Sequence, residues 1–332
     1  MKKRNRNMKK KNRKRVPKVH KKTSPKKLEA PIDMCLLGTG IKDVLAFFRA
    51  IKCKDNWGST RTGKSKVEAS LKKVEKIDYA AISVLTTIAE NFKKDKIVLS
   101  FTNSENRDVR KKLFFSGMTN HFYNEFGKKT NVSVRGGLIN LRDGCGILKV
   151  SEMQLVMESL KNMLLKIGFS QDNVKPLLKS MRSVIMEICG NAIEWGYNKK
   201  EKKWILGIYR ENDCELIITF TDIGDGILKT LNRKTHDVIL DMMKLNDSVD
   251  ILKNAFEKKY GSSTKEPNRN RGLPMIKQKI MQLKDSDLFV LTNDVLVNFS
   301  NLGLSKNLKD LHAHFHGTFY QWRIKNYANK SV

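Results

Sequence analysis

The first third of the chain mixes helical and extended patterns of apolar residues. In residues 41–51, IKDVLAFFRAI, helical periodicity places five apolar side chains on one face: Val44, Leu45, Phe47, Phe48 and Ile51. Residues 76–122 then predict a turn, a helix over about 79–92, a buried strand over 96–101, a polar loop and a helix over about 107–116. Helices alternating with strands in this order predict a small α/β domain over 31–127.

A second periodic region begins near Ser151. Ser151 and Gln154 fit a capping box before an amphipathic helix, and a longer helix is predicted over about 173–196. Strands are predicted over 203–210 and 214–222, joined as a hairpin, and then over 287–294, 295–300 and 317–324. Helices followed by antiparallel strands predict an α+β sandwich over 150–326, with its helices on one sheet face. Residues 128–149, rich in Gly and Asn, are interpreted as a linker.

Charge is concentrated at the N-terminus of this 332-residue chain. Residues 1–27 hold 15 of the 65 Lys and Arg and no acid, within a predicted disordered tail over 1–30. The other 305 residues carry 50 Lys or Arg against 34 acids. Such a tail attracts polyanions such as nucleic acid or an anionic membrane face. A solvated leader without a specific partner explains the composition equally well.

The remaining composition indicates a cytoplasmic protein. The five cysteines are scattered without a C-x-x-C pair, which favours a reducing compartment over a disulfide framework or a zinc ribbon. No apolar run is long enough to cross a bilayer, and no apolar region of a secretory signal follows the basic start. We therefore expect no transmembrane segment.

Residues 58–65, GSTRTGKS, fit the P-loop pattern G-x-x-x-x-G-K-[ST]. A nucleotide-binding P-loop follows a buried strand and opens a helix. Here the preceding residues, AIKCKDNW, are polar and charged. We interpret the string as a polar loop and expect a nucleotide to bind elsewhere.

The candidate catalytic and ligand-binding residues lie in the second half of the chain. Glu187 and Asn191 are four residues apart on the long predicted helix and share a face. An amide oxygen suits magnesium, and a glutamate one turn earlier suits proton transfer beside a phosphate. Asp222 ends an apolar strand and precedes Gly224 and Gly226, which let a backbone approach a flat ligand closely. Taken alone, each piece also fits an exposed helix face or a tight turn capped by the aspartate.

Two further pieces follow a long polar insert. Gly272 opens a helical run whose N-terminal N–H groups suit phosphates, with Arg271 and Lys277 nearby. Gly317 and Thr318 then start the last strand.

The segments MEICGNAIEWGY, TDIGDGI, NRGLPMIK and HGTFYQWRI, in this order, resemble the conserved boxes of the GHKL ATP-binding family. That family includes gyrase B, histidine kinases and the anti-sigma-factor serine kinases, to which the first segment is most similar. The resemblance implies that Asn191 ligates Mg²⁺, that Glu187 is the general base, and that Asp222 accepts a hydrogen bond from adenine beside Thr318.

The same resemblance implies a set of residues that line ATP and its phosphates under a lid over about 228–270. They are Gly224, Gly226, Arg271, Gly272 and Leu273. Two positions depart from the pattern. Trp195 stands where the serine kinases usually carry His, and Pro274 follows Leu273 where a second glycine is usual, which removes one backbone donor.

The first domain resembles a STAS domain, the fold of anti-sigma-factor antagonists, over about 32–125. The resemblance rests on the D-x-x-x-I-x-x-L helix, the following strand and the segment VRKKLFFSGM. Antagonists of this kind carry a serine after the aspartate, whereas Asp78 is followed by Tyr79, Ala80 and Ala81. The usual phosphoacceptor is therefore absent.

These features predict an ATP-binding regulatory protein with weak ATPase or serine-kinase activity and a protein partner. The alternatives are a non-catalytic switch gated by nucleotide, or a nucleic-acid-associated regulator that uses residues 1–27. A homodimer is one of the assemblies compatible with this sequence. His312, His314 and His316 could form a metal site, but without a fourth ligand half-exposed strand histidines are the better interpretation.

Overall fold

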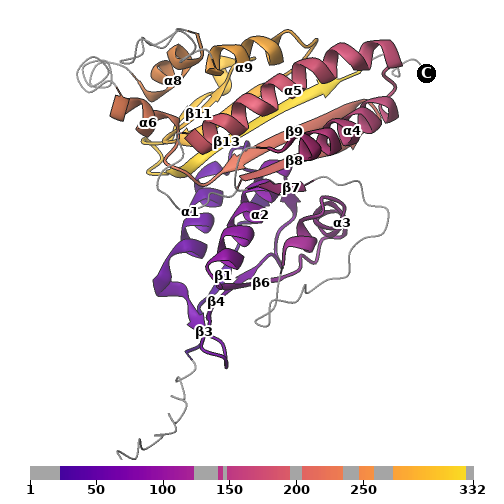
Figure 1. The fold of residues 1–332 in the computed structure, drawn as a ribbon. Helices are drawn as coiled ribbons and strands as arrows, with labels where there is room; N and C mark the ends of the chain where they lie inside the picture. Colours follow the sequence, from indigo (N-terminus) through magenta and orange to yellow (C-terminus); the bar gives the residue numbers. More distant parts are fainter. Residues whose placement is uncertain are drawn as a thin grey trace, which may run out of the picture.

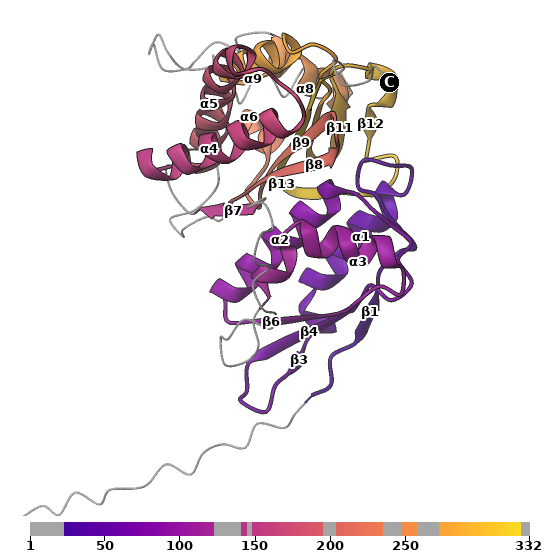
Figure 2. The ribbon, with the colours of Figure 1, turned by 90° about the vertical axis from the view of Figure 1, so that its right-hand side faces the viewer.

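The computed structural model describes residues 23–122, 141–144, 148–194, 204–234, 247–257 and 272–326. The fold is a mixed α/β structure, as the sequence predicts. Its N-terminal half packs beneath a large sheet whose other face is covered by helices (Figures 1 and 2). Among the described helices, none combines the length and the apolar character that crossing a membrane requires.

Within its described residues, the N-terminal half contains three α-helices and two small sheets. The helices are α1 (Ile41–Lys52), α2 (Tyr79–Lys94) and α3 (Arg107–Phe115), with the short 3-10 helices η1 (Lys54–Asn56) and η2 (Met118–His121). In the larger sheet, β4 (Ser65–Ser70) pairs with β1 (Lys27–Glu29), β3 (Gly58–Ser59) and β6 (Val98–Thr102). The smaller sheet pairs β2 (Asp33–Met34) with β5 (Lys76–Ile77). The helices predicted over 41–51, 79–92 and 107–116 are confirmed.

Helix α2 is buried on nearly every side. Asp78 caps its N-terminus by accepting a hydrogen bond from Ala81 N at 2.7 Å, and its other carboxylate oxygen accepts one from Leu37 N at 3.0 Å. The small polar residues Ser83, Thr86 and Thr87 are all fully buried within its first turns. A helix hydrophobic or small all round must have neighbours on all sides, and α2 lies between its own sheet and the large one (Figure 2).

The string GSTRTGKS is part of a hairpin. Gly58 and Ser59 form β3, Thr60 N donates to Lys64 O at 2.8 Å, and β4 begins at Ser65. Lys64 therefore leads into a strand, whereas the lysine of a P-loop opens a helix.

The C-terminal half is built on one antiparallel sheet of seven strands, in the order β12-β11-β10-β13-β9-β8-β7. The strands are β7 (Leu141–Gly144), β8 (Trp204–Asn212), β9 (Glu215–Asp222), β10 (Leu288–Asn293), β11 (Val295–Asn298), β12 (Lys306–Asn307) and β13 (Phe315–Lys325). The helices are α4 (Val150–Lys166), α5 (Gln171–Glu194), α6 (Ile227–Lys234), α8 (Ser248–Glu257) and α9 (Gly272–Met281), with the 3-10 helix η3 (Leu302–Leu304).

Some boundaries differ from the sequence pattern. Strand β7 lies inside the predicted linker and pairs with β8. Helices α6 and α8 lie inside the predicted lid, of which residues 235–246 and 258–270 are outside the described residues. The predicted Ser151–Gln154 capping box is wrong, because α4 begins earlier and Lys149 N donates to Glu152 Oε2 at 2.8 Å.

The large sheet uses both faces for packing. On β9, Leu216, Ile218 and Phe220 join the core beneath the helices, whereas Ile217 joins the core of the N-terminal half. The buried hydroxyl groups of Ser83 on α2 and Thr221 on β9 lie 2.7 Å apart. The N-terminal half thus supplies the second cover of the sheet, which the sequence pattern did not predict.

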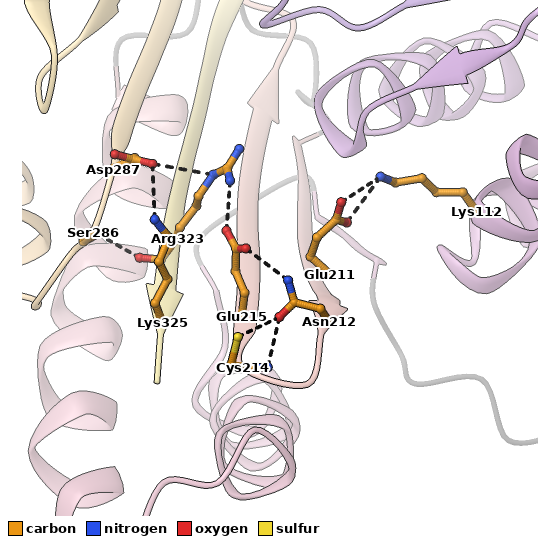
Figure 3. Close-up of polar contacts among 9 residues, drawn as sticks. All are labelled: Lys112, Glu211, Asn212, Cys214, Glu215, Ser286, Asp287, Arg323 and Lys325. Carbon is orange, nitrogen blue, oxygen red and sulfur yellow. Dashed lines mark hydrogen bonds and ion pairs between the residues drawn. The ribbon is translucent and has the colours of Figure 1, made fainter. Parts of the chain in front are cut away.

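Aromatic and charged side chains extend this interface. The rings of Tyr79 and Tyr209 stack with centroids 4.1 Å apart. Lys112 Nζ lies 4.3 Å from the centroid of the Tyr79 ring and 3.2 Å from Glu211 Oε2, as Figure 3 shows for the ion pair. A second polar network around Arg323 and Glu215 lies at the start of β9, away from Asp222 at the other end of that strand (Figure 3).

Candidate functional site

Helix α5 presents its two candidate residues to the N-terminus of α9. Glu187 lies against Gly272, so closely that a Cβ atom at position 272 would collide with Glu187 Oε1. The first turn of α9 leaves backbone N–H groups without helical partners, and the positive end of the helix dipole favours a carboxylate there. The structure therefore brings Glu187 and Gly272 together and gives a steric reason for the glycine.

Asn191 lies one turn further along α5. Its Nδ2 atom is buried and has no hydrogen-bond partner within the part of the chain that the structure describes. A buried amide without a partner is costly, because it has lost its hydrogen bonds to water. The residue is thus suited to a ligand that would satisfy the side-chain amide.

The second group of candidates lies at the ends of β9 and β13. Asp222 and Thr318 are paired across the two strands, and each is 6% exposed. Asp222 Oδ1 accepts a hydrogen bond from Gly224 N at 2.9 Å, which forms the tight turn that the sequence allowed. Gly317 has φ of 122°, and a side chain there would collide with Asp222 O.

Tyr320 connects the two groups, and sequence reasoning missed it. This residue follows Thr318 on the same face of β13 and is almost fully buried. Burial raises the pKa of its phenol, and the negative charges of Asp222 and Glu187 raise it further. Both predicted carboxylates therefore contribute, after burial, to the electrostatic environment of this phenol.

The other predicted residues lie less close to this region. Leu273 packs against the core beneath the helices. Lys277 Nζ binds Glu257 Oε1 at 2.9 Å and lies 5.2 Å from the centroid of the Phe299 ring. Its charge is therefore directed to α8 and to the ring of Phe299, just after β11, rather than held open for phosphate. Arg271 lies outside the described residues.

Sequence reasoning also missed Thr292 and Asn293, which hold the loop containing Gly226. Gly226 itself has φ of 82°, a backbone conformation that favours glycine. An Asn between two apolar strands is a turn signal, but the pattern alone does not reveal which loop its side chain contacts.

The histidine segment brings two of its three rings together. The rings of His314 and His316 have centroids 4.5 Å apart, while His312 lies in a turn with φ of 50°. A search of the described residues finds no cluster of three or more His, Cys, Asp or Glu side chains that could hold a metal ion.

Comparisons with known proteins give no family. No family model matches the chain, and no curated protein matches it. Among solved structures, a mycobacterial sensor histidine kinase, MprB, is similar at 14% identity over 45% of this chain and 71% of that chain, with a TM-score of 0.26. A likeness of this extent establishes neither the fold nor the function.

Proposed function

We propose that the chain is an ATP-binding regulatory protein of the GHKL type. The observation that carries this proposal is that each of two predicted groups brings together residues far apart in the sequence. Glu187 lies against Gly272 at the first turn of α9, and Asp222 lies beside Thr318. The acids of both groups act on Tyr320. Their separation in the sequence makes each meeting a property of the fold rather than of the local pattern.

In the proposed complex, each group has a distinct task. Asp222 would accept a hydrogen bond from the adenine amino group, with Thr318 beside it. Asn191 would contribute its amide oxygen to Mg²⁺, and a half-turn of the amide would place that oxygen where the unpaired Nδ2 now lies. The bound ATP and Mg²⁺ would supply a transferable phosphoryl group and its charge neutralisation.

Glu187 is the residue that separates catalysis from simple binding. A carboxylate at the N-terminus of α9 is stabilised there, and it can accept a proton from a water or a hydroxyl group. We favour weak ATPase or serine-kinase activity for this reason. The rival is a switch in which nucleotide only orders the segment before α9, and Pro274, which lacks a backbone donor, favours that rival.

We propose that the N-terminal half is STAS-like and transmits the state of the site to a protein partner. Asp78 caps α2, and Tyr79 stacks on Tyr209 of the large sheet. The first turn of α2, where related antagonists carry their serine, is therefore packed against the chain's own sheet. This arrangement favours communication within the chain over phosphorylation of that turn.

Calorimetric titration with ATP, with and without Mg²⁺, tests the binding proposal. We expect Asn191→Ala to abolish the Mg²⁺-dependent part of binding and Asp222→Ala to abolish binding altogether. Lys64→Ala is the matched control, because it alters the P-loop-like string and leaves the candidate site intact. Loss of binding in Lys64→Ala alone would overturn the assignment.

Turnover tests the role of Glu187. Glu187→Gln keeps the shape of the side chain, so nucleotide binding should persist while phosphate release or partner labelling falls by about 10²–10⁴-fold. If the wild-type protein binds ATP but shows neither hydrolysis nor transfer to any substrate tested, the non-catalytic switch is the better description.

A further inference from the structure

The turn after Asp222 is capped from a neighbouring hairpin. Gly226 precedes α6 and has no side chain with which to satisfy the first N–H groups of that helix. Asn293, at the turn between β10 and β11, does so instead. Its Oδ1 atom accepts hydrogen bonds from Leu228 N at 3.1 Å and Lys229 N at 3.4 Å. Its Nδ2 atom donates to Asp225 O at 2.7 Å.

Thr292 completes the contact and joins it to the candidate site. Its Oγ1 atom accepts a hydrogen bond from Ile227 N at 2.8 Å and donates to Gly317 O at 3.0 Å. Thr292 pairs with Thr318 on β13, and Thr318 pairs with Asp222 on β9. One row across three neighbouring strands therefore links Thr292 to both predicted base-contacting residues.

The fit between this pair and the loop is close. Thr292 is fully buried, and Asn293 is 5% exposed. A Cβ atom on Gly226 would collide with the amide of Asn293, so the amide fills the space that a side chain would need. Asn293 also has φ of 51°, a conformation that asparagine tolerates better than most residues.

We propose that Thr292 and Asn293 are positioning residues for the candidate nucleotide site. They hold the turn of residues 225–229 against the end of β13, and they thereby fix the glycine loop that follows Asp222. This inference rests on the proposed ATP site for its consequence, but the holding of the turn can be measured without any nucleotide.

The test uses two pairs of variants of the full chain. Asn293→Gly removes the amide and keeps the backbone conformation, and Asp285→Gly is its control. Asp285 has φ of 53° in a turn on the same half. Thr292→Val removes the hydroxyl group, and Thr292→Ser restores it. Hydrogen exchange of the amides at 227–229 is measured without nucleotide, and the Kd for ATP by calorimetry.

We expect faster exchange at 227–229 and a Kd raised about 5- to 30-fold in Asn293→Gly and Thr292→Val, as for the loss of a helix cap. Asp285→Gly and Thr292→Ser should stay near wild type in both. Unchanged exchange, or faster exchange with an unchanged Kd, overturns the inference.

If the wild-type protein binds no ATP, the proposed function fails, and the exchange data alone decide whether the pair holds the turn. If Asn293→Gly does not fold, Thr292→Val and Thr292→Ser decide the question by the same two measurements.

Discussion

Replacing Ser83 and Thr221, singly and together, measures the contact between the two halves. Their hydroxyl groups lie 2.7 Å apart, and both residues are 0% exposed. The structure gives neither hydroxyl another side-chain partner within the described residues. Ser83→Ala leaves the Thr221 hydroxyl buried and unpaired, and Thr221→Val does the same to Ser83.

The expected energies follow from that burial. A buried polar group that loses its only partner costs about 1–3 kcal/mol, whereas removing both partners can be nearly neutral. Each single variant should therefore lower the free energy of unfolding by about 1–3 kcal/mol. The double variant should be about as stable as the better single variant or more stable, which gives a coupling energy of at least about 1–3 kcal/mol.

Urea unfolding monitored by circular dichroism gives the four free energies of the cycle. The control combines Thr221→Val with Ser104→Ala. Ser104 Oγ is buried and bonds to Val74 O at 2.7 Å within the N-terminal half. That pair should be additive within about 0.5 kcal/mol. Additivity in the Ser83–Thr221 cycle as well would refute a direct bond and the docking of α2 on β9.

Three other tests concern local electrostatics and packing. Burial lowers the pKa of Lys52 to about 8, so Lys52→Met should stabilise the fold at pH 7, and the gain should vanish as pH rises from 8 past the ordinary lysine pKa, about 10.5. Desolvation lowers the pKa values of His314 and His316, but both residues are exposed, so the folded state should lose only a little stability as pH falls through about 6.5, and replacing both by Gln should flatten that part of the urea-midpoint profile. Gly272→Ala should displace the flexible end of the Glu187 side chain and cost about 1 kcal/mol, the low end of overpacking costs, and a second change, Glu187→Ala, should recover part of it.

Most elements of the second half were predictable because each carries its own local sequence pattern. Strands β8 and β9 form a hairpin with apolar runs on both sides of a polar turn, and such a pattern is visible in the sequence. Strand β7 was not predictable, because its sequence LRDG carries no alternation. These four residues form a strand because they pair with β8.

The candidate site likewise contains residues that a local sequence pattern predicts and residues that no local pattern reveals. Glu187, Asn191 and Asp222 were predicted from helix spacing, a strand end and the resemblance to the GHKL boxes, and their roles stay predictions. Thr292 and Asn293 act on a loop 65 residues earlier, so no local pattern identifies their partners. Tyr320 was missed for a different reason, because a tyrosine in an apolar strand is interpreted as core until the carboxylates near its hydroxyl group are known.

The alternation of β9 connects the interface to the site. Successive side chains of a strand point to opposite faces, so Thr221 faces α2 while Asp222 faces the side of Thr318 and the helices. A shift of this strand end that changes the Ser83–Thr221 distance also moves Asp222, because the two residues share one peptide unit. If a ligand at Asp222 preferred one position of that strand end, its binding would be coupled to the strength of the contact between the N-terminal half and the sheet. Linkage makes such a coupling equal in both directions, so a change in the Ser83–Thr221 contact would alter ligand affinity by the same factor. The buried hydrogen bond between the halves is therefore a contact at which the proposed coupling can be tested.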